Sequence, residues 1–173
     1  NFTMSGTAAV AVGGDYNLSG NASYNGGTGA GTATLPVGAS PSVIVTLTPV
    51  NDTVVEATEF ATLTLNAGTQ YAPGAPVAGT VLITDDDNAI VTVAFAGSPS
   101  ETGPTAGTYT ISTTSTLEVA VTVNFTMSGA ASTVFGADFT LSGAAYAGPT
   151  GTATLSIGTG PRSVVVTLTP NND

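Results

Sequence analysis

Every second residue is apolar in the stretch Leu117-Glu-Val-Ala-Val-Thr-Val-Asn-Phe-Thr-Met127. A period of two places one row of side chains on a buried face and the other in solvent, as in a half-buried β-strand. The same period recurs at residues 43–48, 80–84 and 108–112, where threonine fills polar positions because its β-branch suits a pleated strand. Gly and Pro separate these runs as turns require. The sequence therefore predicts an all-β fold.

An internal repeat organises the chain. Four segments near the start return near the end in the same order, with one three-residue deletion between them. They are residues 1–6 and 124–129 (both Asn-Phe-Thr-Met-Ser-Gly), Asp15 and Asp138, residues 31–35 and 151–155, and residues 45–49 and 166–170. Self-similarity of this density predicts an array of modules. Antiparallel strands in two layers predict that each module is an antiparallel β-sandwich with Greek-key links.

The phase of the repeat predicts where the modules meet. Residues 1–52 and 124–173 are the same part of the repeat, so we expect the chain to start inside one module and stop inside the next. Residues 1–87 would be the C-terminal part of one module, and residues 88–173 the N-terminal part of its successor. Two interpretations remain open: a fragment of a longer polypeptide, or subunits that complete one another. In the second, open sheet edges accept strands from neighbouring copies of the repeat.

Charge narrows the partners. The chain has eleven acidic residues and one basic residue, Arg162, with neither Lys nor His, and its net charge is −10. Without a basic patch it has nothing to neutralise phosphates, which argues against nucleic acid and anionic membrane surfaces. No apolar run has membrane length, so we expect no membrane insertion. A chain without Cys, rich in Thr and Gly, is typical of a secreted bacterial protein, so we expect an extracellular or cell-surface location with the targeting segment outside this sequence.

The composition also argues against an enzyme. Without His, Cys or Lys, no Ser–His, Cys–His or Ser–Lys nucleophile can form. Paired carboxylates hydrolyse glycosides in other proteins, but this chain has no Trp to serve as a sugar-binding platform. We therefore expect no catalytic residues.

The acidic residues gather at predicted strand ends and loops. Calcium takes six to eight oxygen ligands, several of them carboxylates, and loops at one end of a sandwich can bring these together from distant parts of a chain. Glu118 is the exception and is interpreted as plain strand surface. The other ten are the candidate Ca²⁺ ligands: Asp15, Asp52, Glu56, Glu59, Asp85, Asp86, Asp87, Glu101, Asp138 and Asp173. The alternatives are solubilising charge and, for Asp15 and Asp138, a turn cap made by the side chain.

Three motifs resemble those of Calx-beta domains. Asn51-Asp-Thr-Val-Val-Glu-Ala-Thr-Glu59 resembles the family's acidic stretch, Gly14-Asp-Tyr16 its turn, and Thr80-Val-Leu-Ile-Thr-Asp-Asp-Asp87 its closing strand and triple-Asp end. The resemblance implies immunoglobulin-like sandwich modules in tandem that bind calcium at loops near one end. Asn51 and Asn172 depart from the pattern, because family members often have a second Asp there. Carried over by position, one site would draw on Asp15, Asp52, Glu56, Glu59 and Asp85–Asp87, and the next on Glu101, Asp138 and Asp173.

Three functions fit this description. The first is a calcium-binding structural repeat of an extracellular filament, sheath or rod, made rigid by calcium at the module junctions. The second is a calcium-stabilised adhesin repeat that binds a cell, glycan or partner protein, with the loop between Gly20 and Gly31 as the best candidate surface because it differs in length between the copies. The third is a calcium sensor that switches a neighbouring domain.

Overall fold

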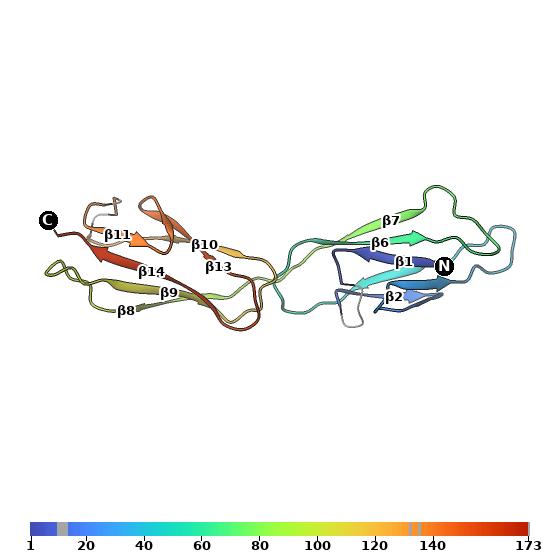
Figure 1. Cartoon of the computed structure of the whole chain (residues 1–173), viewed down its shortest axis with the longest axis horizontal. Helices are drawn as coiled ribbons and strands as arrows, with labels where there is room; N and C mark the ends of the chain where they lie inside the picture. The colour runs from blue at the N-terminus through green and yellow to red at the C-terminus, as the bar shows by residue number, and fades with distance from the viewer. Residues whose placement is uncertain (10–13, 132, 135, 173) are drawn as a thin grey trace. The chain divides into compact units, whose positions relative to one another are not determined.

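The computed structural model describes residues 1–9, 14–131, 133–134 and 136–172. Within these residues the chain is all-β, as predicted, with fourteen strands and no helix (Figure 1). Its contacts divide it into two compact units. Unit 1 is Asn1–Asp52 with Ala57–Asp85, and unit 2 is Thr53–Glu56 with Asp86–Asp173.

No helix in the described part of the chain is long and apolar enough to cross a membrane.

Unit 1 is built from two antiparallel sheets. One has the strand order β3-β4-β1-β6-β7, and the other pairs β2 with β5. The strands are β1 Phe2–Gly6, β2 Tyr16–Gly20, β3 Ala22–Tyr24, β4 Ala30–Ala33, β5 Val45–Pro49, β6 Glu59–Leu65 and β7 Ala78–Ile83. The buried core joins Phe2 and Met4 of the first sheet to Tyr16 of the second. Because both sheets contribute to one core, the unit is sandwich-like.

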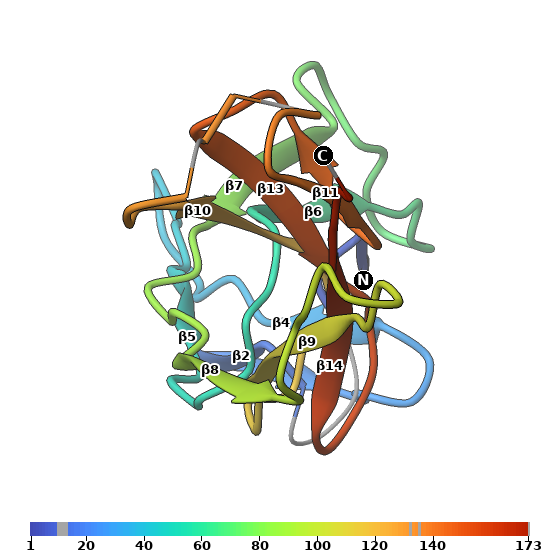
Figure 2. The ribbon, with the colours of Figure 1, turned by 90° about the vertical axis from the view of Figure 1, so that its left-hand side faces the viewer.

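Unit 2 follows the same plan. Its sheets have the orders β11-β14-β9-β8 and β10-β13-β12, and Figure 2 shows β14 beside β9. The strands are β8 Val91–Ala96, β9 Gly107–Thr113, β10 Val121–Thr126, β11 Phe139–Ser142, β12 Ala145–Tyr146, β13 Thr150–Leu155 and β14 Arg162–Pro170. One core cluster draws Ile111, Phe139 and Val166 from the first sheet and Ala153 from the second.

The repeated sequence folds with a repeated register. Phe2 lies opposite Gly31 in unit 1, and its copy Phe125 lies opposite Gly151 in unit 2. In both pairs the glycine is required, because a Cβ there would collide with the phenylalanine ring. Correspondingly, β2 pairs with β5 from Tyr16 opposite Pro49, and β11 pairs with β14 from Phe139 opposite Pro170. The copied segments are therefore the same structural element at the level of individual residue pairs.

One predicted strand is shorter than the alternation suggested. The period-two pattern spans residues 117–127, but β10 begins at Val121. Leu117 instead forms isolated bridges to Val55 and Gly158, and it is fully buried with Val55 and Leu155 in a second core cluster of unit 2. The bridges occupy the backbone of Leu117 outside the β10–β13 ladder, so alternation continues in the sequence where pairing with β13 does not.

Candidate metal site

Three consecutive aspartates follow the end of β7. Asp85, Asp86 and Asp87 each offer a carboxylate oxygen, and these oxygens all lie within 4.8 Å of one another. Asp85 and Asp87 are half-buried and Asp86 is exposed. Among the described residues this is the one group of three or more Asp, Glu, His or Cys side chains close enough to hold a metal ion. Like charges this close repel each other, and a bound cation would turn that repulsion into attraction.

The tripeptide spans the division between the two units. Asp85 is the last residue of unit 1, whereas Asp86 and Asp87 begin the main segment of unit 2. The other predicted ligands of the first site divide in the same way, with Glu56 in unit 2 and Asp52 and Glu59 in unit 1. That all of these residues form one site stays a prediction.

Within unit 1, two acidic residues lie at matching strand ends. Glu59 is the first residue of β6 and lies opposite Ile83 of β7, two residues before Asp85. The antiparallel ladder therefore brings the start of β6 and the end of β7 to the same edge of the sheet. Glu59 is half-buried there, whereas Asp52, which follows β5, is exposed.

Asp15 has a structural role in its loop. Its carboxylate accepts a hydrogen bond from the backbone N–H of Ala9, and its carbonyl accepts one from Val50 at 2.9 Å. The loop before β2 is thereby fastened to the end of β5. The adjacent Tyr16 phenol has its pKa raised to about 12, chiefly by burial, with further contributions from Tyr24 and from the negative charge of Asp15. The alternative interpretation of Asp15, a loop-fastening side chain, thus matches its contacts.

Asp138 repeats part of this arrangement in unit 2. Its carbonyl accepts a hydrogen bond from the backbone N–H of Asn171 at 2.9 Å, which is the copy of the Val50 contact. The Asn171 side chain adds hydrogen bonds to the carbonyls of Gly136 at 2.9 Å and Ala137 at 2.6 Å. The end of β14 is therefore tied to the loop that carries Asp138.

Glu101 and Asp138 line one cleft of about 540 Å³ at the end of unit 2. The sequence predicted both as ligands of the second site, and the structure brings them to the same concavity from loops far apart in the chain. The third predicted ligand, Asp173, lies outside the described residues. Hydroxyl side chains that the sequence analysis did not select share the lining: Ser100, Thr102, Ser128 and Thr133. Because Ser and Thr are frequent throughout the chain, only their place in these loops distinguishes them.

The two remaining charged residues have local roles. Glu118 is exposed, as its interpretation as strand surface requires, and its backbone N–H donates to the carbonyl of Val55 at 2.9 Å. Arg162 begins β14, and its Nη2 donates to the carbonyl of Thr159 at 3.0 Å in the turn just before it.

Comparison with known proteins gives no relative: no family model, no curated protein and no solved structure matches the chain. The resemblance to Calx-beta domains therefore stays a prediction based on the motifs quoted above.

Proposed function

We propose that this chain is a calcium-binding structural repeat of an extracellular or cell-surface array, a filament, sheath or rod of tandem immunoglobulin-like Greek-key modules. The observation that carries the proposal is the Asp85–Asp87 cluster, whose carboxylate oxygens lie within 4.8 Å of one another in a chain with repeated structure. The matched registers of the copied strands support the array, since the same residue pairs recur in both units.

Calcium fits these side chains better than the transition metals do. The chain has no Cys and no His, so oxygen atoms are the available side-chain ligands, and oxygen suits hard cations. Calcium also tolerates variable coordination, which suits ligands at a surface where two of the three aspartates are only half-buried. Backbone carbonyls and water would complete the six to eight ligands that calcium takes.

Calcium would act here on the backbone that joins the units. Without a cation, the three adjacent negative charges favour extended, mutually distant side chains. With a cation, carboxylates that converge on one ion restrict the backbone of Asp85–Asp87, which links the main segments of the two units. Stiffening at each such joint would make an array of repeats rigid, which is a mechanical function and requires no catalytic residue.

Calcium titration calorimetry tests the proposal. The native chain is expected to bind calcium with a Kd at or below about 1 mM, the weak end of the range for extracellular modules. The variant D85N/D86N/D87N removes the charges at nearly constant volume and is expected to bind at least about tenfold more weakly. Glu118→Gln removes an exposed acid outside the cluster and is the matched control, with affinity unchanged. Equal binding by the triple variant, or none by the native chain at millimolar calcium, overturns the proposal.

A further inference from the structure

β1 and β10 are copies of one strand with one shared neighbour. Phe2 and Thr3 of β1 lie opposite Gly31 and Ala30 of β4, and Phe125 and Thr126 of β10 lie opposite Gly151 and Thr150 of β13. The residue after these also matches, because the N–H of Met4 donates to the carbonyl of Gly29 at 2.7 Å and that of Met127 to Pro149 at 2.8 Å. On this side, the two strands are in equivalent surroundings.

The opposite edges of the two strands differ. In unit 1 the second edge of β1 pairs with β6, with Phe2 opposite Leu65 and Met4 opposite Leu63. In unit 2, β10 is the terminal strand of its sheet. The consequence is visible in the side chains: Phe2 and Met4 are 2% and 5% exposed, whereas Phe125 and Met127 are only half-buried. Identical residues thus gain or lose their cover according to whether a β6-type strand is present.

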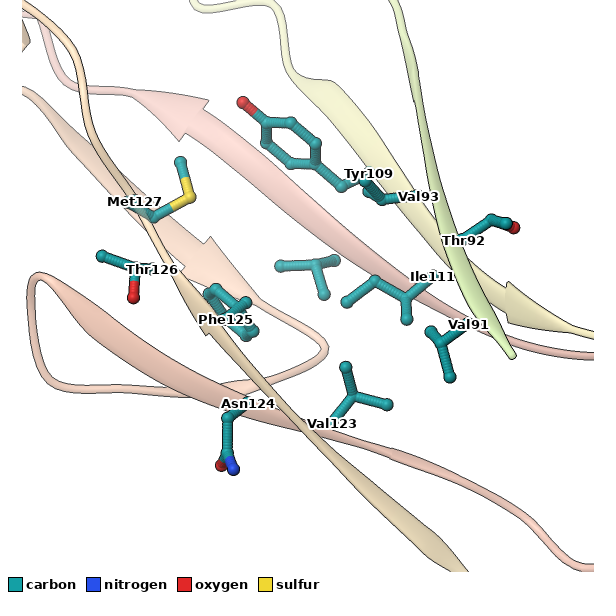
Figure 3. A pocket seen from close by; sticks show the side chains of 11 residues that line it. Val91, Thr92, Val93, Tyr109, Ile111, Val123, Asn124, Phe125, Thr126 and Met127 are labelled. Carbon is teal, nitrogen blue, oxygen red and sulfur yellow. The ribbon is translucent and has the colours of Figure 1, made fainter. Parts of the chain in front are cut away.

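An apolar cleft lies beside β10. It has a volume of about 350 Å³ and is lined mainly by apolar side chains of β8, β9 and β10. Figure 3 shows Val123 and Phe125 pointing toward Val91 and Ile111 across it, while the polar ends of Thr92 and Asn124 point away. The strand facing β10 across this opening, β8, is also terminal in its sheet, and its Val93 is 66% exposed.

We propose that this cleft is an acceptor site for a β6–β7 hairpin from another copy of the repeat. The first strand of that hairpin pairs with β10 in the register that β6 uses on β1, with Leu65 opposite Phe125 and Leu63 opposite Met127. The β6 strand of the same chain is not available, because β1 and β7 occupy both of its edges within unit 1. The inward row of the hairpin carries Ala61 and the two leucines, which match the apolar lining of the cleft.

The inference deepens the proposed array by naming the contact between its copies, and it rests on the array but not on calcium. Hydrogen exchange in a calcium-free buffer with chelator therefore tests it separately from the metal site. The probe is a synthetic peptide of residues 57–85 added to the whole chain. Exchange of the β10 amides is expected to slow by about tenfold or more at saturating peptide, since strand addition protects edge amides, and β1 serves as the internal reference with unchanged exchange.

Peptide variants leave the acceptor intact and test the register. Leu63→Asp with Leu65→Asp places charges in the cleft and is expected to abolish protection of β10. Thr62→Asp with Thr64→Asp changes the outward row of the same strand and is the matched control, with protection retained. Equal protection by both variants contradicts the proposed register.

An extended chain removes any ambiguity from a peptide that fails to form a hairpin. A second copy of residues 53–87 is joined after Asp173, which has the same place in the repeat as Asp52. The β10 amides are then expected to exchange as slowly as those of β1. Unchanged exchange of β10 in the extended chain overturns the proposal, whatever the peptide does.

Discussion

Val55 forms a β-bridge with Leu117 inside unit 2. The N–H of Val55 donates to the carbonyl of Thr116 at 3.1 Å, and the carbonyl of Val55 accepts from the N–H of Glu118 at 2.9 Å. Val55 is buried together with Leu117 and Leu155, although it lies in the middle of an acidic segment. The segment Thr53–Glu56 is therefore part of the core of unit 2 as well as a carrier of a candidate ligand.

Truncating Val55 should destabilise unit 2. Val55→Ala removes two buried methyl groups and is expected to cost roughly 1–3 kcal/mol. Hydrogen exchange should then accelerate in β13 and β14, while β1 and β6 keep the native rates. Val134→Ala is the control, because Val134 is 69% exposed and contributes little burial. Equal acceleration in both units would contradict the assignment of Thr53–Glu56 to unit 2.

The glycine opposite each conserved-register phenylalanine should resist substitution. Gly31→Ala forces its Cβ into the ring of Phe2, and overpacking of this kind costs roughly 1–3 kcal/mol in chemical denaturation. Gly79→Ala is the control, because a Cβ at that position of β7 meets nothing within 4 Å. It should be neutral or stabilise by about 0.4–1 kcal/mol through reduced entropy of the unfolded chain. The account fails if Gly31→Ala is as stable as Gly79→Ala.

Tyr16 predicts a loss of stability in alkali. Its pKa rises from 10.0 in the unfolded chain to about 12 in the folded one, so the unfolded state releases the proton first. The contribution of Tyr16 to stability is fully present below pH 10.0 and declines as the pH rises toward 12. Denaturation curves of the native chain and of Tyr16→Phe across this range measure it. The decline attributable to Tyr16 should be absent in the variant, and an equal decline in both would refute the assignment.

The strands and their repeat could be predicted from the sequence because their signals are local. Alternating residues gave β9 as residues 108–112, where the strand is Gly107–Thr113, and the copied hexapeptides identified β1 and β10 as one element. The convergence of Glu101 and Asp138 on one cleft was also predicted, since both lie in loops at strand ends.

Other features depend on contacts that no local pattern encodes. The burial of Val55 needs Leu117 and Leu155, which are distant in sequence, and its neighbours are acidic. The open edge of β10 depends on the absence of a partner strand, which the sequence of β10 itself cannot reveal. The hydrogen bond from Ala9 to Asp15 likewise depends on how the loop before β2 folds back.

Removing charge from the triple aspartate should not harm the metal-free protein. In chelator, D85N/D86N/D87N relieves repulsion among three carboxylates and is expected to melt at the same temperature as the native chain or higher. Thermal unfolding followed by far-ultraviolet circular dichroism measures this. A lower midpoint for the variant in chelator would mean that the aspartates stabilise the fold through contacts of their own rather than through a cation.

The most direct test of calcium binding is the thermal midpoint of the chain with calcium and with chelator. Binding to the folded state alone stabilises it by about 2.7 kcal/mol at a calcium concentration one hundred times Kd. In a unit of this size that corresponds to a rise on the order of 10 °C, and D85N/D86N/D87N should lose most of it. A midpoint that is the same in calcium and in chelator would contradict the account and leave the aspartates as solvated charge.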